Sequence, residues 1–481
     1  LHSSRDSSNH LELLEKYRSL HAYIAANKVP ALNRIFYIAN KEGWSVDKLA
    51  KKMKDAVDGS YYPKSYSEYE RDLAVLLYEI GGGATLYALN HSPLSLPSRF
   101  TISRQRQSFS LQESTAGLRI TEILQNIKTV FEGYAPGVGR RGINLSQDET
   151  ASENRLCWCP STDKVFGLCE HAKRLGDLRL GKDMKSVEKI VRAVRVEKDI
   201  HIAQEISVAA FSLYDENFYG ARPVLIMPTC KKGDWKLAAM QNAVLLAAWK
   251  FSPFGAAAHG DIWSLSSDGD PKRRPALYLV TMVRQVQPSD ILFNWLGKLP
   301  GLNLLCGPNF ETPSFDPKHD IKRCCTLLSS IDGMVVNGVI INKSILGLWF
   351  QRLEGHDWTE IDIENVFNFG DHQDVPRAFT LLCLVADLRE LDDSDLDPSE
   401  IHTFRSLKLL GKLFAYLVEP FLLLDLSLFS QMKRLVKFAY LAFALYVKHG
   451  QSFMTPQLYG DIQAMIKNAI FLVAHTKSLD P

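Results

Sequence analysis

Two aspartates stand where a predicted strand gives way to a turn, and their type and placement favour metal chemistry. Asp148 follows a short alternating run in LSQDETA, and Asp268 follows the apolar run IWSLSS that leads into DGD. Carboxylates at the C-terminal mouths of strands are where open α/β sheets bind ligands. Oxygen ligands suit Mg²⁺, and two metals about 3.5–4 Å apart support phosphoryl transfer on nucleic acids. We therefore predict Asp148 and Asp268 as metal ligands; Glu149 and Asp270 are alternatives, and simple turn formation is another.

Arginines occur without acidic neighbours in an earlier helical stretch, RFTISRQRQ. They are Arg99, Arg104 and Arg106. A helix, a turn and a Ser-capped helix that carries arginines is what a small DNA-binding module needs. We predict phosphate contacts for these three residues, and the alternative is a solvated helical face.

Cysteines and a histidine flank a predicted hairpin turn, PSTDK. In a hairpin, residues i and i+2 share a face, so Cys157-x-Cys159 and Cys169-x-His171 could converge on zinc. Structural zinc sites more usually show Cys-x₂₋₄-Cys spacing, and free cysteines are among the most buried residues. Packing is therefore the first interpretation and a zinc site the alternative.

A third polar constellation lies in DPKHDIKR. Asp316, His319 and Lys322 recur at helical spacing and so present one polar face. This face is typical of a capped, solvated helix start, and nucleotide binding is the functional alternative.

The elements that position these residues belong to a chain of ordinary globular composition. Of its 481 residues, 46% are hydrophobic and 23% are charged, which excludes disorder and coiled coil as overall descriptions. The net charge of +2 does not by itself indicate a nucleic-acid-binding protein. Eight scattered cysteines are expected as reduced thiols in an intracellular protein.

The start of the chain and its two most apolar segments allow further predictions. LHSSRDSSNH lacks the apolar core of a signal peptide and begins with Leu rather than Met, so we expect a fragment or a processed product. LFAYLVEPFLLLDLSLF is interrupted by Glu419, Pro420 and Asp425, and LVKFAYLAFALYV is too short to span a bilayer. No membrane partner is expected.

The order of predicted elements indicates an α/β protein with helical regions before and after the sheet. Antiparallel strands are followed by helix, strand and helix, which is the layout of a mixed sheet with a parallel crossover. Beyond it the strand signal mostly disappears, and three long helices run from Ile401 to about Ser478. The expected parts are a helical N-terminal segment, a helix-turn-helix-like DNA-binding region, an α/β core and an all-helical domain, at 1–60, 61–135, 140–315 and 316–481.

Four stretches, in this order, resemble the P-element and THAP-type DNA transposases and their fungal relatives. RDLAVLLYEIGGGATLYALNHSPLSLPSRFTISR resembles the helix-turn-helix before the catalytic domain. LSQDETASENRLCWCPSTDKVFGL resembles the first catalytic strand and hairpin, and WSLSSDGDPKRR resembles the strand that ends in the second catalytic acid. FDPKHDIKRCCTLL resembles the helix that leads into the insertion domain. In outline the resemblance covers residues 66–480.

The resemblance implies a transposase with an RNase H-like core interrupted by a large all-α insertion. Such enzymes cut and join transposon ends on DNA with three acids and Mg²⁺, and in the P-element type the insertion binds GTP. Asp148 and Asp268 would be the first two acids. A basic cluster would lie near the DNA backbone: Lys272, Arg273 and Arg274. A homo-oligomer on DNA and a nuclear location are also implied.

Two departures from the family pattern lead us to expect an inactive protein. The family's third acid is a Glu in a Leu-Glu-x-x-Phe-like helix, whereas this chain stops at AHTKSLDP and Glu390, Glu400 and Glu419 lack that context. A THAP-type zinc module is not recognisable either. Loss of one metal ligand weakens positioning and charge neutralisation. The alternatives are a non-catalytic DNA-binding remnant and a nucleotide-binding regulator that uses Asp316 and Lys322.

Overall fold

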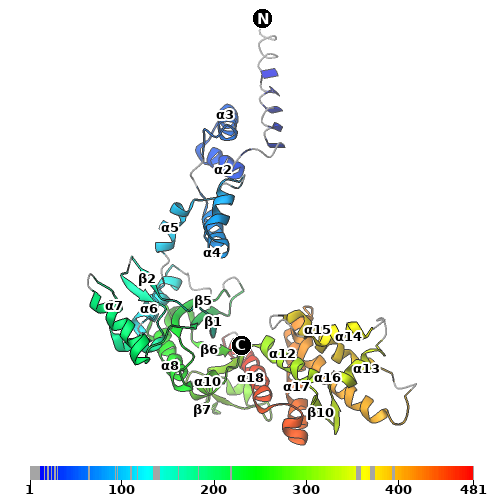
Figure 1. Cartoon of the computed structure of the whole chain (residues 1–481). Coiled ribbons are helices and arrows are strands. Elements are labelled where there is room, and N and C mark those ends of the chain that lie inside the picture. Colours follow the sequence, from blue (N-terminus) through cyan, green and yellow to red (C-terminus); the bar gives the residue numbers. More distant parts are fainter. Residues whose placement is uncertain are drawn as a thin grey trace. The chain divides into compact units, whose positions relative to one another are not determined.

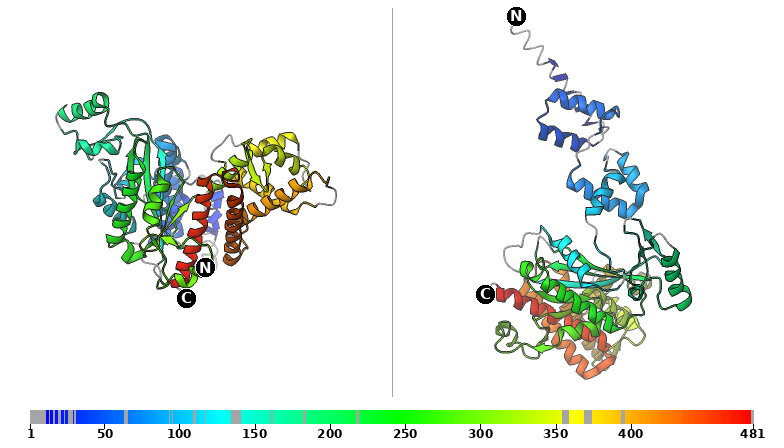
Figure 2. Two further views of the ribbon diagram at one scale, coloured as in Figure 1. Left: turned by 90° about the horizontal axis from the view of Figure 1, so that it is seen from below. Right: turned by 90° about the vertical axis from the view of Figure 1, so that its left-hand side faces the viewer.

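The protein is described here by a computed structural model that divides into two compact units, Leu1–Ser110 and Leu111–Pro481. Figures 1 and 2 show the ribbon. Besides isolated positions between 11 and 29, the described residues are 31–62, 66–92, 94, 96–108, 111–115, 117–133, 141–160, 162–181, 184–216, 219–353, 359–368, 374–392 and 396–479. Within helix 99–108, side chains are described only up to residue 103.

The first unit is helical, as predicted. Its elements are α2 (Leu32–Glu42), α3 (Val46–Val57), α4 (Glu68–Asn90) and α5 (Arg99–Ser108). Ser45 caps α3, and Ser67 and Glu70 form a capping box at the start of α4. The backbone of Gly82 leaves the helical region at φ 71° and kinks α4. From Glu68 to Ser108 the chain therefore forms the first half of α4, a kink at Gly82, the second half of α4, a loop and α5.

Helix α4 is also long and apolar enough to cross a membrane by length and composition. Its Ala74 and Leu86, however, are buried in one small core with Leu96 and Ile102. Only 11% of the apolar window of α4 is buried, and a single helix of this kind is weak evidence of a membrane span.

The second unit is built on a mixed five-stranded sheet, in agreement with the predicted α/β class. Its strands are β1 (Ile143–Ala151), β4 (Glu205–Leu213), β5 (Arg222–Thr229), β6 (Ile262–Ser267) and β9 (Thr312–Phe315). Their order is β5-β4-β1-β6-β9. Strand β4 is antiparallel to β5 and β1, whereas β1, β6 and β9 run parallel.

Helices α6 (Ile120–Phe131), α8 (Trp235–Phe251) and α10 (Arg273–Thr281) cover the apolar side of this sheet. Phe131 of α6, Trp249 of α8 and Phe211 of β4 pack together there, with ring centroids 4.5–5.2 Å apart in the two Trp249 pairs. Because α6 shares this core, the boundary between the units lies at residue 110 rather than at the expected 135.

Smaller elements surround the sheet. They are β2 (Cys157–Cys159), β3 (Lys164–Phe166), η1 (Glu170–Leu175), α7 (Met184–Val191), η2 (Arg192–Glu197), α9 (Ala256–His259), β7 (Arg284–Gln285), α11 (Phe293–Leu296) and β8 (Leu305–Cys306). Strands β2 and β3 form the predicted hairpin.

The helical region after the sheet has a core of its own. Its helices are α12 (Pro317–Ser329), α13 (Lys343–Phe350), α14 (Glu360–Phe367), α15 (Val375–Asp387), η3 (Leu388–Glu390), α16 (Ile401–Leu422), α17 (Leu428–His449), η4 (Gly450–Ser452) and α18 (Pro456–Leu479). The expectation of an all-helical domain was wrong in one respect, since β10 (Met334–Val336) and β11 (Val339–Ile341) form a hairpin. Asn337 and Gly338, both with positive φ, make its turn.

Helix α18 returns from the helical region to the sheet. Leu458 and Ile462 belong to the helical core, whereas Ala464 belongs to the core of the sheet. Asn468 accepts a hydrogen bond from the hydroxyl of Thr312 on β9 at 2.8 Å. Figure 2 (left) shows this red helix between the sheet and the yellow and orange helices. The sheet and the helical region therefore share one structural element.

Candidate metal centre

The two predicted ligands, Asp148 and Asp268, lie at the same level of neighbouring parallel strands. In the register of β1 and β6, Ser146 pairs with Ser266. Each aspartate stands two residues further along its own strand direction, Asp148 still within β1 and Asp268 just beyond β6. The structure therefore brings together two carboxylates that are 120 residues apart in the sequence.

A third aspartate, Asp316, ends the next parallel strand at this edge. Ser267 of β6 pairs with Phe315 of β9, so Asp268 and Asp316 follow directly after paired residues. The backbone N–H of Asp316 donates to the carbonyl of Ser267 at 3.0 Å. The sequence interpretation took Asp316 as part of a capped helix start, with nucleotide binding as the alternative. The cap is present, but the position of Asp316 beside Asp268 was missed.

The three aspartates face one open cavity of about 420 Å³, which His319 also lines. On β1, Gln147 points to the opposite side, where its amide donates to Asn242 of α8 at 2.6 Å. Because successive side chains of a strand alternate between faces, Asp148 points away from the covering helices. The carboxylates thus gather on the side of the sheet that is accessible to a ligand.

Local hydrogen bonds differ among the two predicted ligands and their alternatives. Oδ1 of Asp148 accepts from the N–H of Glu149 at 2.8 Å, and Oδ1 of Asp268 accepts from the N–H of Asp270 at 3.0 Å. Neither bond uses Oδ2. By contrast, both oxygens of Glu149 bind Arg273, so Glu149 is a poorer ligand candidate than Asp148. Asp270 accepts from the N–H groups of Lys272 and Arg273 through Oδ1 alone, so it stays an alternative to Asp268.

Asp316 is more heavily engaged than the other two aspartates. Its Oδ1 caps α12 by accepting from the N–H of Lys318 at 3.0 Å, and its Oδ2 lies 3.0 Å from Nδ1 of His319. Lys322 does not line the cavity. The predicted trio is therefore divided, with Asp316 and His319 beside the acidic edge and Lys322 further along α12.

The three basic residues after Asp268 have different environments. Arg273 is buried, and its guanidinium binds Glu149, Gln147 and, at 2.9 Å, the hydroxyl of Ser207. Arg274 binds Asp461 of α18. Lys272 is the exposed member of the cluster. Phosphate contact by Lys272 stays a prediction, whereas the charges of Arg273 and Arg274 are compensated inside the protein.

A buried ionic network fixes the turn that carries Asp268. Arg274 donates to the carbonyl of Gly269 at 2.7 Å, and Arg323 donates to the carbonyl of Asp268 at 3.2 Å. Gly269 has φ 80°, and a Cβ there would lie only 2.9 Å from Oδ2 of Asp461. The turn therefore requires glycine at this position.

Asp320 is a buried carboxyl next to this network. Burial first, and then the charge of Asp461, raise its pKa to about 8, while the charge of Arg323 opposes this shift. Among the described residues, neither of its oxygens has a hydrogen-bond partner. The raised pKa favours the protonated carboxyl at neutral pH, and the buried position of Asp320 was not evident from sequence.

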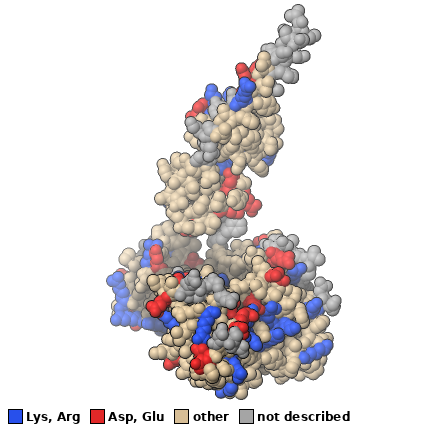
Figure 3. Space-filling model, turned by 90° about the vertical axis from the view of Figure 1, so that its right-hand side faces the viewer, with Lys and Arg blue, Asp and Glu red and all other residues tan. Residues whose placement is uncertain are grey.

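The predicted arginines of the first unit are described only in part. Arg99 is exposed at the start of α5, with its guanidinium 5.7 Å from the ring centroid of Tyr78. The side chains of Arg104 and Arg106 lie outside the described set. On the surface seen in Figure 3, basic and acidic side chains are interspersed. DNA contact by these arginines stays a prediction.

The zinc cluster of Cys157, Cys159, Cys169 and His171, which the sequence offered as an alternative to packing, is not formed. Cys157 and Cys159 lie on β2, whereas Cys169 and His171 meet His201 and Cys230 instead. The hairpin argument failed because Cys169 stands beyond β3, at the start of η1, and so does not continue the face of the hairpin.

Comparison with known proteins supports the fold. No family model and no curated protein sequence matches the chain. Among solved structures, the Drosophila P element transposase strand transfer complex matches with a TM-score of 0.50 and 14% sequence identity, over 90% of this chain and 85% of that chain. The chain has a transposase-like fold. At this level of identity the likeness concerns the fold alone.

One signal in the sequence could have located Asp316. It directly follows TPSF, in which Pro313 weakens the strand signal because proline cannot donate to a sheet ladder. Strand β9 lies at the edge of the sheet, where proline is tolerated. An edge strand ending in an aspartate was therefore compatible with the sequence.

Proposed function

We propose that the protein is a transposase-like, DNA-binding protein whose RNase H-like core binds divalent metal at Asp148 and Asp268. One observation carries the proposal: three adjacent parallel strands place Asp148, Asp268 and Asp316 at the same edge of the sheet and at the same level. The strand order and directions of the sheet and the fold similarity support it. DNA is the proposed partner, since the similar structure is a transposase strand transfer complex.

The donor set fits Mg²⁺, because hard divalent cations prefer carboxylate oxygens. When bound, Mg²⁺ would supply charge stabilisation for phosphoryl transfer. Asp148 and Asp268 would hold it, and Arg274 and Arg323 would keep the turn of Asp268 in place. Lys272 would attract the phosphate backbone of DNA from its exposed position.

Asp316 is the candidate for a third carboxylate at this edge. Its hydrogen bonds to Lys318 and His319 compete with metal binding, so we expect weak catalysis at most. The acids weighed from sequence serve elsewhere: Glu419 binds Arg389 and Arg434, and Glu400 binds Arg352. Glu390 pairs with Arg389.

Metal binding tests the proposal directly. Mn²⁺ should be titrated into the full chain and followed by electron paramagnetic resonance, with Mg²⁺ as competitor. We expect Asp148→Asn and Asp268→Asn each to weaken Mn²⁺ binding at least ~10-fold, whereas Asp332→Asn, at an exposed position in the helical region, leaves it unchanged. Equal Mn²⁺ binding by the wild type and the double variant would contradict the proposal.

The non-catalytic alternative predicts a different response. If the protein only binds or bridges DNA, Asp148→Asn leaves metal-stimulated DNA affinity unchanged, while Arg99→Ala weakens DNA binding and lowers its salt dependence. Fluorescence anisotropy with a labelled duplex at several salt concentrations separates the two cases. Homo-oligomerisation on DNA and nuclear location stay predictions from the resemblance.

A second candidate function is nucleotide binding in the helical region. A cavity of about 560 Å³ there is lined by Arg405, Lys408 and Lys412, with Phe404 beside them. Three cations and an aromatic ring suit a nucleotide, and GTP is the candidate that the resemblance implies. Calorimetric titration with GTP should show heat in the wild type and less in Lys412→Ala; absence of heat in the wild type removes this candidate.

A further inference from the structure

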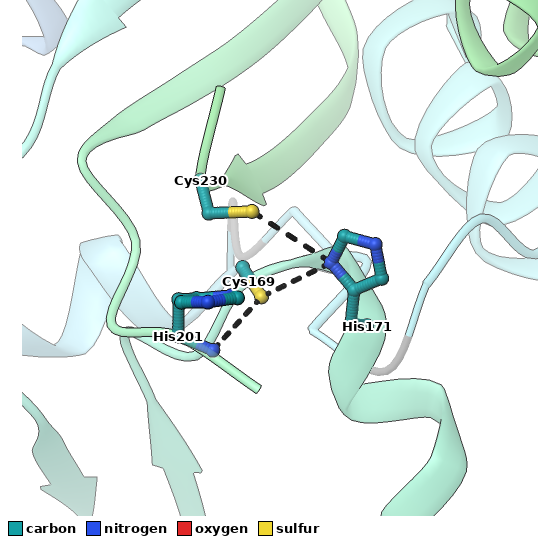
Figure 4. Close-up of side chains that lie close together, drawn as sticks. All are labelled: Cys169, His171, His201 and Cys230. Atoms are coloured by element: carbon teal, nitrogen blue, oxygen red, sulfur yellow. Dashed lines mark hydrogen bonds between the residues drawn. The ribbon is translucent and has the colours of Figure 1, made fainter. Parts of the chain in front are cut away.

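Four metal-ligating side chains from three separate segments converge at the C-terminal end of β5. Cys169 precedes η1 and His171 lies within it, His201 precedes β4, and Cys230 follows β5. One potential ligand atom from each residue lies within 4.8 Å of all the others. Figure 4 shows the two sulfurs and the imidazole of His171 directed toward one another. This cluster is separate from the acidic edge and uses none of its residues.

The distances within the cluster are those of a nearly formed tetrahedron. Nδ1 of His171 lies 3.4 Å from Sγ of Cys169 and 3.7 Å from Sγ of Cys230. Zinc bonds of about 2.3 Å to sulfur and about 2.0–2.1 Å to nitrogen imply roughly 3.6 Å between the two ligand atoms at a tetrahedral angle. The side chains therefore need only small movements to enclose an ion.

His201 supplies an independent indication. Its Nδ1 is buried, and no group in the described part of the chain forms a hydrogen bond with it. Its Nε2 lies 2.8 Å from Nζ of Lys232, and Lys232 is exposed and free to turn toward solvent. A buried polar atom without a partner is costly. A metal ion at Nδ1 would remove this cost.

The surroundings are those of a metal site rather than of a simple apolar core. The N–H of His201 donates to Sγ of Cys169 at 3.3 Å, which favours a thiolate. The buried carboxylate of Glu170 accepts from the N–H of Cys230 at 3.1 Å and lies 3.9 Å from Nδ1 of His171. Outer groups of this kind orient ligands and add negative charge beside a cation. Leu168 and Ile200 shield the cluster from water.

We infer that Cys169, His171, His201 and Cys230 bind one zinc ion. Two sulfur and two nitrogen ligands suit zinc rather than Mg²⁺, and four protein ligands fill its tetrahedron, so the role is structural. The ion would join η1, the segment before β4 and the end of β5. Lys231 and Gly233, one and three residues after Cys230, line a second cavity together with Asp148, Asp268 and residues of α8. The zinc ion would thus fix one wall of this second cavity, which adjoins the candidate metal centre.

The stoichiometry of bound metal tests this inference. The full chain should be purified without chelators and without metal-affinity chromatography. Elemental (inductively coupled plasma) mass spectrometry should then find one zinc ion per chain. We expect Cys169→Ser and Cys230→Ser to lose most of it. The matched control is Cys157→Ser, since this exposed cysteine on β2 lies outside the cluster. Zinc that persists in both cluster variants, or is lost equally in the control, overturns the inference.

Substitution with Co²⁺ keeps the test independent of variants that fail to fold. Wild-type protein loaded with Co²⁺ should show the intense visible bands of tetrahedral coordination and a sulfur-to-cobalt charge-transfer band. Weak bands of octahedral type, or a Cys169–Cys230 disulfide found by peptide mass spectrometry, overturn the inference. Neither readout depends on Mn²⁺ or DNA binding, so failure here and failure of the proposed function are distinguishable.

Discussion

Arg274 of α10 and Asp461 of α18 form a bidentate ion pair, with Nε–Oδ1 at 2.7 Å and Nη2–Oδ2 at 2.6 Å. Arg323 of α12 donates to the same Oδ2 at 2.7 Å. Asp461 is fully buried, and both arginines also bind backbone carbonyls of the Asp268–Gly269 turn. One carboxylate therefore connects the last helix, the helical region and the candidate metal centre.

We expect Asp461→Asn to destabilise the protein strongly. Removing the charge leaves Arg274 and Arg323 without their shared partner, and breaking a buried pair costs about 3–5 kcal/mol. Arg323 is partly exposed, so about 3 kcal/mol is expected. Urea unfolding measures the change, and Asp332→Asn, expected within about 0.5 kcal/mol of wild type, is the control. A loss below about 1 kcal/mol would show that the network is dispensable.

Asp320 should make stability fall as pH rises. Its pKa is about 8 in the folded protein because of burial, whereas an unfolded Asp ionises near pH 4. Between about pH 4 and about pH 8 the folded state binds the extra proton, so alkali favours unfolding. In urea unfolding, the free energy of unfolding of Asp320→Asn should rise relative to that of the wild type as pH increases. The rise should be at most about 1.4 kcal/mol per pH unit in this window. A constant difference would refute the assignment.

Lys272 and Arg273 should separate DNA binding from stability. Lys272 is exposed, so Lys272→Ala should weaken DNA binding and reduce the salt slope by about 1 while leaving the melting temperature unchanged. Arg273 is buried against Glu149, so Arg273→Ala should instead lower the melting temperature by several degrees. Fluorescence anisotropy measures the DNA affinity of both variants, and thermal unfolding measures their melting temperatures. If Arg273→Ala weakened DNA binding and Lys272→Ala lowered the melting temperature, Arg273 would be the DNA-facing residue.

His475 should make the folded protein less stable at acid pH. Burial lowers its pKa to about 4, and its ring stacks on Trp263 with centroids 4.6 Å apart. The unfolded residue takes up a proton near pH 6.5, so the contribution of neutral His475 is complete above that pH and is lost as pH falls toward about 4. His475→Phe keeps the stacking and should show a smaller drop in melting temperature between neutral and acid pH than wild type.

Local patterns in the sequence predicted much of the architecture. An alternating run and an apolar run predicted β1 and β6, and the expected order of antiparallel strands, helix, strand and helix matches the structure. The three long C-terminal helices were also predicted. Asp148 and Asp268 were chosen as candidates because strand ends can be recognised from a few neighbouring residues. The hairpin around Asn337 and Gly338 was missed although its turn signal is local.

Tertiary structure alone decided which residues share a site. Asp316 joins the acidic edge through strand register, Cys230 and His201 join Cys169 and His171 from about thirty residues or more away in the sequence, and Arg273 turns inward to Glu149. Sequence periodicity reports which face of its own element a residue occupies. It carries no record of the partner strand or helix, because that choice is made by packing and hydrogen bonding between segments distant in the chain.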